Sequence, residues 1–163
     1  LNSNYKNYCI VRTGWNVGIN SKSRCVVSLT YDTLLNKGAK MATDNSFTIT
    51  YVEDLAKAIR TIIFINKKKI LHLCSSEIIT RTKLADTIIK QSKKGNKMSY
   101  KDALFSDIKY NEPRARLNNL RTEYEDLSKI LHFRSAEETI KHKSPHAAWF
   151  VFSCQFLEPA LPV

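Results

Sequence analysis

Residues 50–91 read TYVEDLAKAIRTIIFINKKKILHLCSSEIITRTKLADTIIKQ, and their pattern decides the class of fold. Thr50 and Glu53 have the spacing of a capping box, in which each side chain pairs with a backbone N–H at the start of a helix. The apolar run at residues 70–74 is typical of a buried strand, and a second helix is expected over Arg81–Gln91. This order of helix, strand and helix predicts a mixed α/β fold.

The apolar periodicity of the two helices predicts which faces are buried. On the first helix the expected stripe consists of Leu55, Ile59 and Ile62, with Ala56 and Ile63 beside it. On the second helix, which Thr80 caps, the expected inward residues are Leu84, Ala85, Ile88 and Ile89. Glu53 and Asp54 at the start of the first helix are explained by capping and by the helix dipole, so we assign neither a catalytic role.

The same alternation continues toward the N-terminus. Residues 7–12 (NYCIVR) predict another buried strand, and residues 39–43 predict a short one. Between the first strand and the next helix, residues 13–18 form a loop with two glycines and a tryptophan, a common place for ligand contacts. Residues 25–36 predict a helix that ends at Gly38. Its expected apolar stripe is Val26, Leu29, Thr33 and Leu34.

Toward the C-terminus the pattern is irregular from residue 97 to residue 121. Two further capping boxes, at residues 122–125 and 135–138, predict helices that end near residues 131 and 141. Residues 144–163 differ from everything before them, because they contain no Lys or Arg but three of the four prolines. We expect residues 144–163 to be an atypical apolar tail that contributes little to the fold. It is either a native tail or a foreign or frame-shifted sequence after a truncated gene.

Composition narrows the class of protein. The 163 residues carry 26 Lys and Arg against 15 Asp and Glu, a formal net charge of +11. This excess indicates either a solvated lysine-rich surface or an anionic partner, which would be a phosphorylated small molecule or nucleic acid. No apolar run is long enough to span a membrane. The four cysteines (Cys9, Cys25, Cys74 and Cys154) lack paired spacing, which favours reduced thiols in the cytoplasm over disulfides or a metal site.

Four blocks of the sequence follow one family pattern. Residues 8–15 read YCIVRTGW, residues 44–56 read DNSFTITYVEDLA, and residues 70–73 read ILHL. In the fourth block Pro113 and Arg114 precede Leu120 and a capped helix. In this order and spacing the blocks resemble dTDP-4-dehydrorhamnose reductases, the extended short-chain dehydrogenases that reduce a keto-sugar nucleotide with NADPH.

The resemblance implies that residues 1–143 are the C-terminal, substrate-binding part of a Rossmann-like enzyme without its N-terminal dinucleotide-binding strands. The glycine-rich loop and the Tyr-x-x-x-Lys pair of the family precede the matched region, and neither occurs in this chain. NADP or NAD is therefore expected in the intact enzyme, and no cofactor, catalytic residue or activity in this chain alone. The implied partners are a nucleoside diphosphate sugar and the missing N-terminal half. Phe47, Ile49 and Ala115 depart from the family pattern, which leaves the sugar, and reductase versus epimerase, open.

The candidate site residues follow from their chemistry together with the resemblance. Trp15 offers a ring for stacking, and Asn16 offers hydrogen bonds to ligand hydroxyls. Arg114 is the better candidate, and Arg116 the second, for a guanidinium that grips the diphosphate. Thr13 is the candidate contact to the cofactor. Trp15 and Arg114 are expected on one concave surface, although each also has a purely structural interpretation.

Two more polar residues have structural explanations, and a second function stays open. Arg12 ends a strand and is expected to pair with Asp54, and His72 is expected to be a core histidine. The alternative function is a small basic nucleic-acid-binding module. Binding to a phosphate backbone falls steeply with salt, whereas binding of one diphosphate in a pocket falls far less, so a salt titration separates the two.

Overall fold

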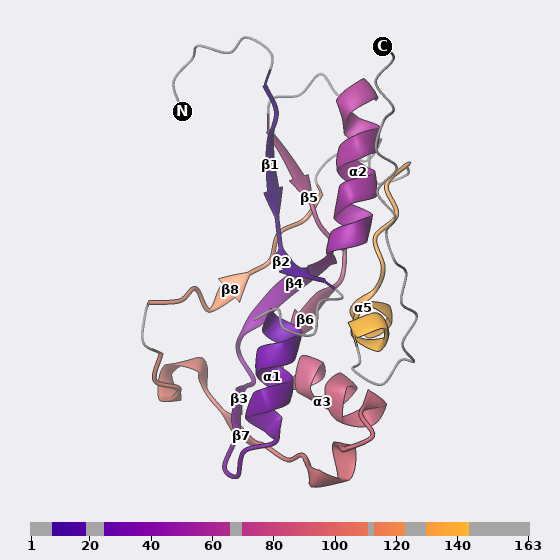
Figure 1. Cartoon of the computed structure of the whole chain (residues 1–163). Coiled ribbons are helices and arrows are strands. Elements are labelled where there is room, and N and C mark those ends of the chain that lie inside the picture. Colours follow the sequence, from indigo (N-terminus) through magenta and orange to yellow (C-terminus); the bar gives the residue numbers. More distant parts are fainter. Residues whose placement is uncertain (1–7, 19–24, 66–69, 111–112, 123–129, 144–163) are drawn as a thin grey trace, which may run out of the picture.

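The computed structural model describes residues 8–18, 25–65, 70–110, 113–122 and 130–143, and they form the mixed α/β fold that the sequence predicts (Figure 1). The strands are β1 (Ile10–Thr13), β2 (Trp15–Val17), β3 (Lys40–Ala42), β4 (Ser46–Tyr51), β5 (Ile70–Leu73), β6 (Ile78–Thr80), β7 (Lys101–Ala103) and β8 (Leu117–Asn118). The helices are α1 (Val26–Leu34), α2 (Val52–Ile65), α3 (Arg81–Gln91) and α5 (Ala136–Lys143), with short 3-10 helices η1 (Gly95–Lys97) and η2 (Phe105–Asp107).

The strands pair in three small sheets. β1 pairs in parallel with β5, and β3 pairs in parallel with β7. The central sheet has the order β2-β4-β6, in which β4 runs parallel to β2 and antiparallel to β6, while β8 also pairs with β4. β4 is therefore the hub of the described fold. No helix in the described residues is long and apolar enough to cross a membrane.

Two apolar clusters hold these elements together. In the lower part of Figure 1, α1, α3 and α5 gather around the central sheet, and in the upper part α2 lies along β1 and β5. The larger cluster includes Val27, Leu34, Phe47, Ile79, Leu84 and Ile140. The second cluster packs α2 on β5 through Ala58, Ile62, Leu71 and Leu73.

The stretch predicted as a ligand-contact loop contains a strand, β2, so that prediction is wrong in part. Trp15 lies opposite Ile49 of β4, whereas β1 pairs with β5, so the chain changes sheet at Gly14. A Cβ atom on Gly14 would lie 2.6 Å from Thr48 Oγ1 and 2.8 Å from the Thr48 carbonyl oxygen. Only glycine allows this close approach between the bend and β4. The bend allows β1 to pair with β5 and β2 to pair with β4. Both pairings join distant parts of the chain, so a local sequence pattern does not reveal them.

The capping box predicted at Thr50 is also wrong. Thr50 belongs to β4, opposite Asn16 of β2, and α2 begins two residues later at Val52. Thr50 is fully buried, and its hydroxyl has no hydrogen-bond partner among the described residues. Pairing with β2 holds Thr50 in an extended conformation, so the tertiary context overrides the local signal for a helix start.

The buried faces of α1 and α2 differ from the predicted stripes. On α1 the buried residues are Val26, Val27, Thr30 and Leu34, whereas Leu29 is 39% exposed and Thr33 is exposed. On α2 the buried residues are Asp54, Ala58 and Ile62, whereas Ile59 is 36% exposed, Ile63 is 69% exposed and Ala56 is exposed. Both helices have apolar residues around more than half of their circumference, so only packing on the sheets selects the buried face.

Most of the remaining predicted elements are confirmed. Strands β1, β3 and β5 and helix α3 lie where the sequence predicts them, and Leu84, Ala85 and Ile88 are buried on α3 with Ile89 packed beside them. Gly38 has a φ of +80°, although Leu35 is the C-cap of α1, so Gly38 forms a turn beyond the helix. Residues 123–129 of the helix predicted to open at Thr122 lie outside the described residues, as do the tail at residues 144–163 and with it Cys154.

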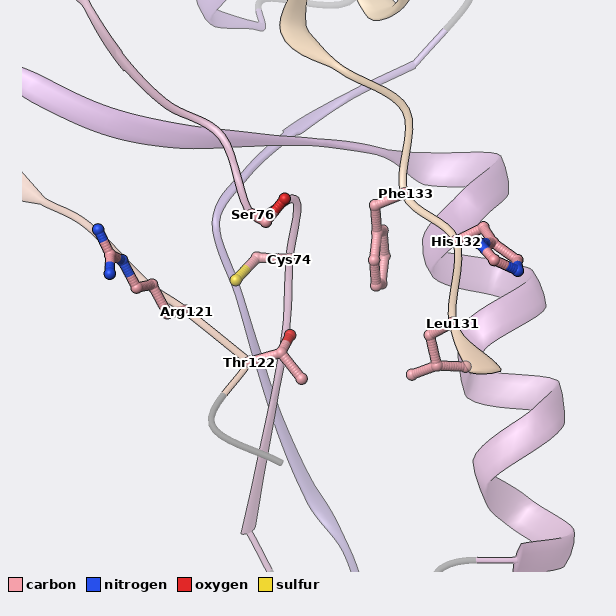
Figure 2. Close-up of a pocket in the computed structure, with 7 residues that line it drawn as sticks. All are labelled: Cys74, Ser76, Arg121, Thr122, Leu131, His132 and Phe133. Atoms are coloured by element: carbon pink, nitrogen blue, oxygen red, sulfur yellow. The ribbon is translucent and has the colours of Figure 1, made fainter. Parts of the chain in front are cut away.

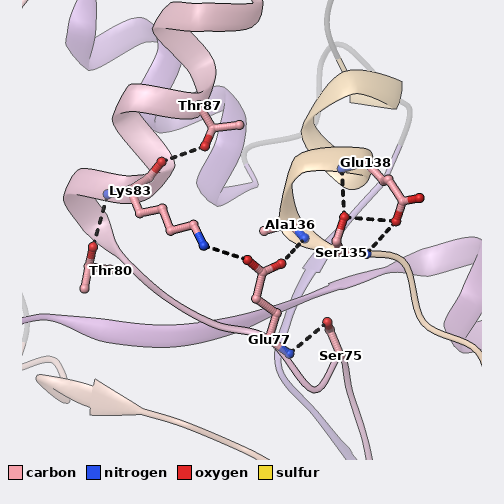
Figure 3. Close-up of polar contacts among 8 residues, drawn as sticks. All are labelled: Ser75, Glu77, Thr80, Lys83, Thr87, Ser135, Ala136 and Glu138. Carbon is pink, nitrogen blue, oxygen red and sulfur yellow. Dashed lines mark hydrogen bonds and ion pairs between the residues drawn. The ribbon is translucent and has the colours of Figure 1, made fainter.

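Helices α3 and α5 are capped as predicted. At the start of α3, Thr80 Oγ1 accepts a hydrogen bond from the Lys83 backbone N–H at 3.1 Å. At the start of α5, Ser135 and Glu138 form a reciprocal capping box, with the Glu138 N–H donating to Ser135 Oγ and the Ser135 N–H donating to the Glu138 carboxylate (Figure 3). These caps form within four residues, so a local pattern suffices to predict them.

Two polar contacts join residues that lie far apart in the sequence and meet only in the folded chain. Asp54 is buried and pairs with Arg134, with 3.5 Å between Asp54 Oδ1 and Arg134 Nη2, so the predicted partnership with Arg12 is wrong. Arg12 is exposed on β1. The segment before α5 packs on the start of α2 and supplies the cation instead. His72 is partly buried, and its carbonyl accepts a hydrogen bond from Thr122 Oγ1 at 2.9 Å.

The described cysteines Cys9, Cys25 and Cys74 form no disulfide with one another. Cys74 is buried, as its apolar strand predicts, whereas Cys9 is exposed immediately before β1. The described residues contain no cluster of His, Cys, Asp or Glu that would hold a metal ion.

Candidate functional site

The candidate site is built around Trp15, which the bend at Gly14 directs toward β4. The indole ring stacks on Phe47 with 5.3 Å between ring centroids and 24° between planes. Phe47 is 1% exposed, whereas Trp15 is half-buried. Trp15 therefore has one side supported by the core and another available to line a surface.

Trp15 and Arg114 line the same concave space, a cavity of about 190 Å³ that we call the Trp15–Arg114 cavity. Its walls come from β2, α1, β3, the first residue of α3 and the segment before residue 115. The lining residues are Trp15, Val26, Leu29, Thr30, Thr33, Lys40, Met41, Arg81, Ile108, Tyr110 and Arg114. The sequence leads to this juxtaposition only through the resemblance, since the two residues lie far apart in the chain.

The charge of this cavity has one sign. Among the described residues that line it, three are cations, namely Lys40, Arg81 and Arg114, and none is a carboxylate. Lys40 also lies opposite Lys101 in the β3–β7 register, and like charges facing each other across strands repel. The arrangement favours an anion with an apolar or aromatic part.

Arg81 is a lining residue that the sequence analysis missed, as it missed Lys40. Its Cζ lies 5.3 Å from the centroid of the Trp15 ring and 5.0 Å from that of Phe47, and its Nη1 donates to Thr30 Oγ1 at 3.3 Å. Burial lowers the pKa of the guanidinium, and the like charge of Arg114 adds to this effect while Tyr110 opposes it. In the sequence Arg81 is only a residue after a helix cap. The antiparallel pairing of β6 with β4 brings it to Phe47.

Arg114 also lines the cavity, from the segment that precedes β8. Its Cζ lies 5.3 Å from the centroid of the Tyr110 ring, and Tyr110 in turn packs on Phe105 at 5.0 Å between ring centroids. The side chain of Arg114 is exposed. Arg114 thus shares a concave surface with Trp15, as expected from the sequence, and it is more exposed to solvent than Arg81.

The other candidate residues do not line the cavity. Asn16 Nδ2 donates to Thr13 Oγ1 at 3.2 Å, and Thr13 Oγ1 contacts the Gly14 carbonyl at 3.3 Å, so these two side chains organise the bend. Arg116 Nη1 lies 3.6 Å from Asp44 Oδ2, which makes Arg116 an ion-pair partner of the loop before β4. Roles for Thr13, Asn16 and Arg116 in ligand contact stay predictions.

A second cavity, of about 510 Å³, lies beyond the end of β5. Figure 2 shows Cys74 and Thr122 on one side of it and Leu131 and Phe133 on the other. Burial raises the pKa of the Cys74 thiol, opposed by a contact with Thr122, so the thiol is neutral at pH 7 and a weak nucleophile. Residues 123–129, which join the two walls, lie outside the described residues.

The described residues do not fit a dinucleotide cofactor. A pyrophosphate needs glycines that leave open space for the ligand beside backbone N–H groups. Beside Gly14 that space is filled by Thr48, and beside Gly18 it is filled by Val52 Cγ2 at 3.2 Å. Gly95 is closed by the Ile89 carbonyl. Gly38 has open space beside it, but it is followed by β3 and not by the helix N-terminus that a pyrophosphate site needs. Within the described residues we therefore derive no step that uses a nicotinamide cofactor.

Comparisons with solved structures place this fold among known ones. A dTDP-4-dehydrorhamnose reductase from Clostridium acetobutylicum is similar with a TM-score of 0.69 and 20% identity, over 83% of this chain and 47% of that chain. The Bacillus anthracis dTDP-4-dehydrorhamnose reductase in complex with NADP is similar with a TM-score of 0.65 and 20% identity, over 82% of this chain and 46% of that chain.

A Thermotoga maritima UDP-glucose 4-epimerase with UDP-glucose is similar with a TM-score of 0.59 and 14% identity, over 83% of this chain and 44% of that chain. No family model and no curated protein matches the sequence. The chain spans less than half the length of these similar structures. It therefore shares the fold of part of the dTDP-4-dehydrorhamnose reductases and of the extended short-chain dehydrogenases related to them.

Proposed function

We propose that this chain is the C-terminal, substrate-binding portion of a sugar-nucleotide reductase of the dTDP-4-dehydrorhamnose reductase type. It binds a nucleoside diphosphate sugar and carries no catalytic group of its own. NADP or NAD and the proton-transfer residues belong to the dinucleotide-binding half of the intact enzyme. The absence of paired cysteine spacing supports a cytoplasmic location.

The observation that carries this proposal is the composition of the Trp15–Arg114 cavity. An aromatic wall and three cations, with no carboxylate among the described lining residues, suit a ligand that combines a ring with phosphate groups. At about 190 Å³ the cavity holds part of a sugar nucleotide rather than all of it, so the remainder extends along the open side. Trp15 supplies apolar contact, Arg114 a charge-assisted hydrogen bond, and Asn16 a contact to a hydroxyl beyond the cavity.

The β1–β5 pair supports the proposal that this chain is one half of a larger fold. Parallel sheets are normally covered on both faces and contain more than two strands. α2 covers one face through Leu71 and Leu73, whereas Ile70 on the other face is 45% exposed and Arg12 is exposed. A dinucleotide-binding half with further parallel strands would extend this sheet beside β1 and cover its open face.

The test of the proposed function is calorimetric titration of the pure chain with thymidine 5′-diphosphate and dTDP-glucose. Thymidine, which lacks the phosphates, is the matched control ligand. We expect binding of both phosphorylated ligands and about tenfold or more weaker binding of thymidine, because charge-assisted hydrogen bonds contribute roughly 1.5–3 kcal/mol each. For the same reason Arg114→Ala is expected to weaken dTDP-glucose binding by about 1.5–3 kcal/mol. Equal binding of thymidine and its diphosphate would contradict the proposal.

A second candidate function, a nucleic-acid-binding module, rests on the net charge of +11. The same chain is titrated with a single-stranded oligonucleotide at rising salt. Oligonucleotide affinity that falls by several orders of magnitude between low and moderate salt, together with no binding of dTDP-glucose, would favour this function. Retained dTDP-glucose binding at moderate salt favours the sugar-nucleotide function.

A further inference from the structure

We propose that Arg81 is the principal phosphoryl-contact residue of the Trp15–Arg114 cavity, held in place by the rings of Trp15 and Phe47. The inference rests on the proposed function, because it takes the ligand of this cavity to carry a diphosphate. It reverses the ranking that the sequence suggests, in which Arg114 is the main cation.

The guanidinium of Arg81 is held by three neighbours. It lies against Trp15 and Phe47 with Cζ-to-centroid distances of 5.3 and 5.0 Å. Its Nη1 donates to Thr30 Oγ1, and the Thr30 hydroxyl in turn donates its hydrogen to the Val26 carbonyl oxygen at 2.7 Å. Thr30 is therefore a fixed acceptor for Arg81. A side chain ordered in this way loses little conformational freedom when a ligand binds.

The charge of Arg81 has no counter-ion among the described residues. The other desolvated arginine, Arg134, has two carboxylates within 3.6 Å, and Arg116 has Asp44 at the same distance. No carboxylate of the described residues lies within 4.0 Å of Arg81. A cation that is removed from water without a counter-ion destabilises the protein, and a bound anion offsets that cost. One of its five N–H donors is used within the described residues, which leaves donors for a phosphoryl group.

Arg81 and Arg114 differ in how strongly solvent screens them. Arg114 is exposed and lies over Tyr110, whereas Arg81 is partly buried against the stacked rings of Trp15 and Phe47. The attraction between a cation and an anion grows as water is excluded around them. The contribution of Arg81 to phosphate binding is therefore expected to exceed that of Arg114, although both line the cavity.

The test measures binding of inorganic pyrophosphate and thymidine 5′-diphosphate by calorimetry and by Trp15 emission, with Trp149→Phe as the background so that one tryptophan reports. The variants are Arg81→Gln, Arg81→Lys and Arg114→Ala. Lys90→Gln is the matched control, because it removes one positive charge from α3 at an exposed position that does not line the cavity. Circular dichroism and thermal unfolding check that each variant folds. Arg81→Lys keeps the charge and remains informative if Arg81→Gln does not fold.

We expect Arg81→Gln to lower the affinity for both ligands by about thirtyfold or more. This fold-change in affinity should be at least about three times the one caused by Arg114→Ala. Arg81→Lys restores part of the affinity, because it keeps the charge but lacks the planar fork. Lys90→Gln binds as the parent does. If the parent binds thymidine 5′-diphosphate and the Arg81 variants bind it equally well, the role of Arg81 is overturned while the proposed function stands. If the parent binds neither ligand, both are overturned.

Discussion

The carboxylate of Glu77, in the turn before β6, accepts a hydrogen bond from the backbone N–H of Ala136 at 2.6 Å, across 59 residues of sequence. The other carboxylate oxygen lies 2.9 Å from Lys83 Nζ on α3 (Figure 3). A single side chain therefore caps the start of α5 and ties it to α3. The helix dipole adds to this contact, because the N-terminus of α5 carries partial positive charge.

Glu77 is expected to make stability depend on acid pH. Burial alone would raise its pKa, but the hydrogen bonds from Ala136 and Lys83 outweigh that and hold the pKa below the ordinary value of 4.5. The stabilisation is present above about pH 4.5 and is lost as pH falls through the lower folded-state pKa. Thermal unfolding between pH 7 and pH 3 measures this decrease. Glu77→Gln should reduce the decrease and cost about 1–2 kcal/mol at pH 7. An unchanged pH profile in Glu77→Gln would contradict the assignment.

Gly14→Ala is expected to destabilise the chain by about 1–3 kcal/mol, the usual range for overpacking. The new methyl group would meet the Thr48 backbone oxygen at 2.8 Å, so β2 and β4 must separate and Trp15 must shift. Chemical denaturation measures the stability, and Trp15 emission reports the shift. Gly38→Ala is the control, because nothing lies within 4 Å of its added carbon and only its φ of +80° is unfavourable. Equal stability of Gly14→Ala and the parent would refute the close approach.

Arg134→Gln and Arg12→Gln separate the observed partner of Asp54 from the one expected from sequence. Arg134→Gln leaves the buried Asp54 carboxylate without its guanidinium, which is expected to cost about 3 kcal/mol. Arg12→Gln changes an exposed residue, and we expect less than about 0.5 kcal/mol. Urea unfolding of both variants measures the difference. A larger loss of stability for Arg12→Gln than for Arg134→Gln would support the pairing of Asp54 with Arg12 that was expected from the sequence.

The pure chain is expected to show no NADPH-dependent reduction of keto-sugar nucleotides. Three described glycines (Gly14, Gly18 and Gly95) have no space beside them for a pyrophosphate, and the fourth, Gly38, is followed by β3 and not by a helix. The sequence also contains no Tyr-x-x-x-Lys pair. NADPH oxidation is followed by absorbance at increasing protein concentration, with an intact dTDP-4-dehydrorhamnose reductase as the positive control. Turnover that scales with the concentration of this chain would contradict the prediction.

Truncation after residue 143 is expected to leave the melting temperature within a few degrees. The prediction rests on the composition of residues 144–163, which contain no Lys or Arg but three of the four prolines. About 1 kcal/mol shifts the midpoint of a domain of this size by roughly 2–4 °C, so even a modest packing role is measurable. Loss of soluble expression on truncation would show that the tail supports the fold.

Short-range features were predictable from the sequence. The caps at Thr80 and at Ser135–Glu138 span four residues each, and the apolar runs of β1 and β5 are contiguous. The cap interactions are made within one turn, so the local pattern contains all the information needed for them. The apolar runs identify β1 and β5 as strands, although the pairing of β1 with β5 joins residues about 60 positions apart. The same runs, in their order, led to the α/β class and to the resemblance that put Trp15 and Arg114 on one surface.

Tertiary structure alone decided where the pairing partners lie. Thr50 has the local signature of a helix cap, yet pairing with β2 keeps it in β4. Asp54 pairs with Arg134 rather than Arg12, because the segment before α5 packs on the start of α2. Arg81 enters the site because β6 runs antiparallel to β4 and brings it against Phe47 and Trp15. The physical reason is the same in each case. Hydrogen bonds between strands and the burial of charge depend on residues far apart in the chain, and these outweigh the small free energies of local propensity.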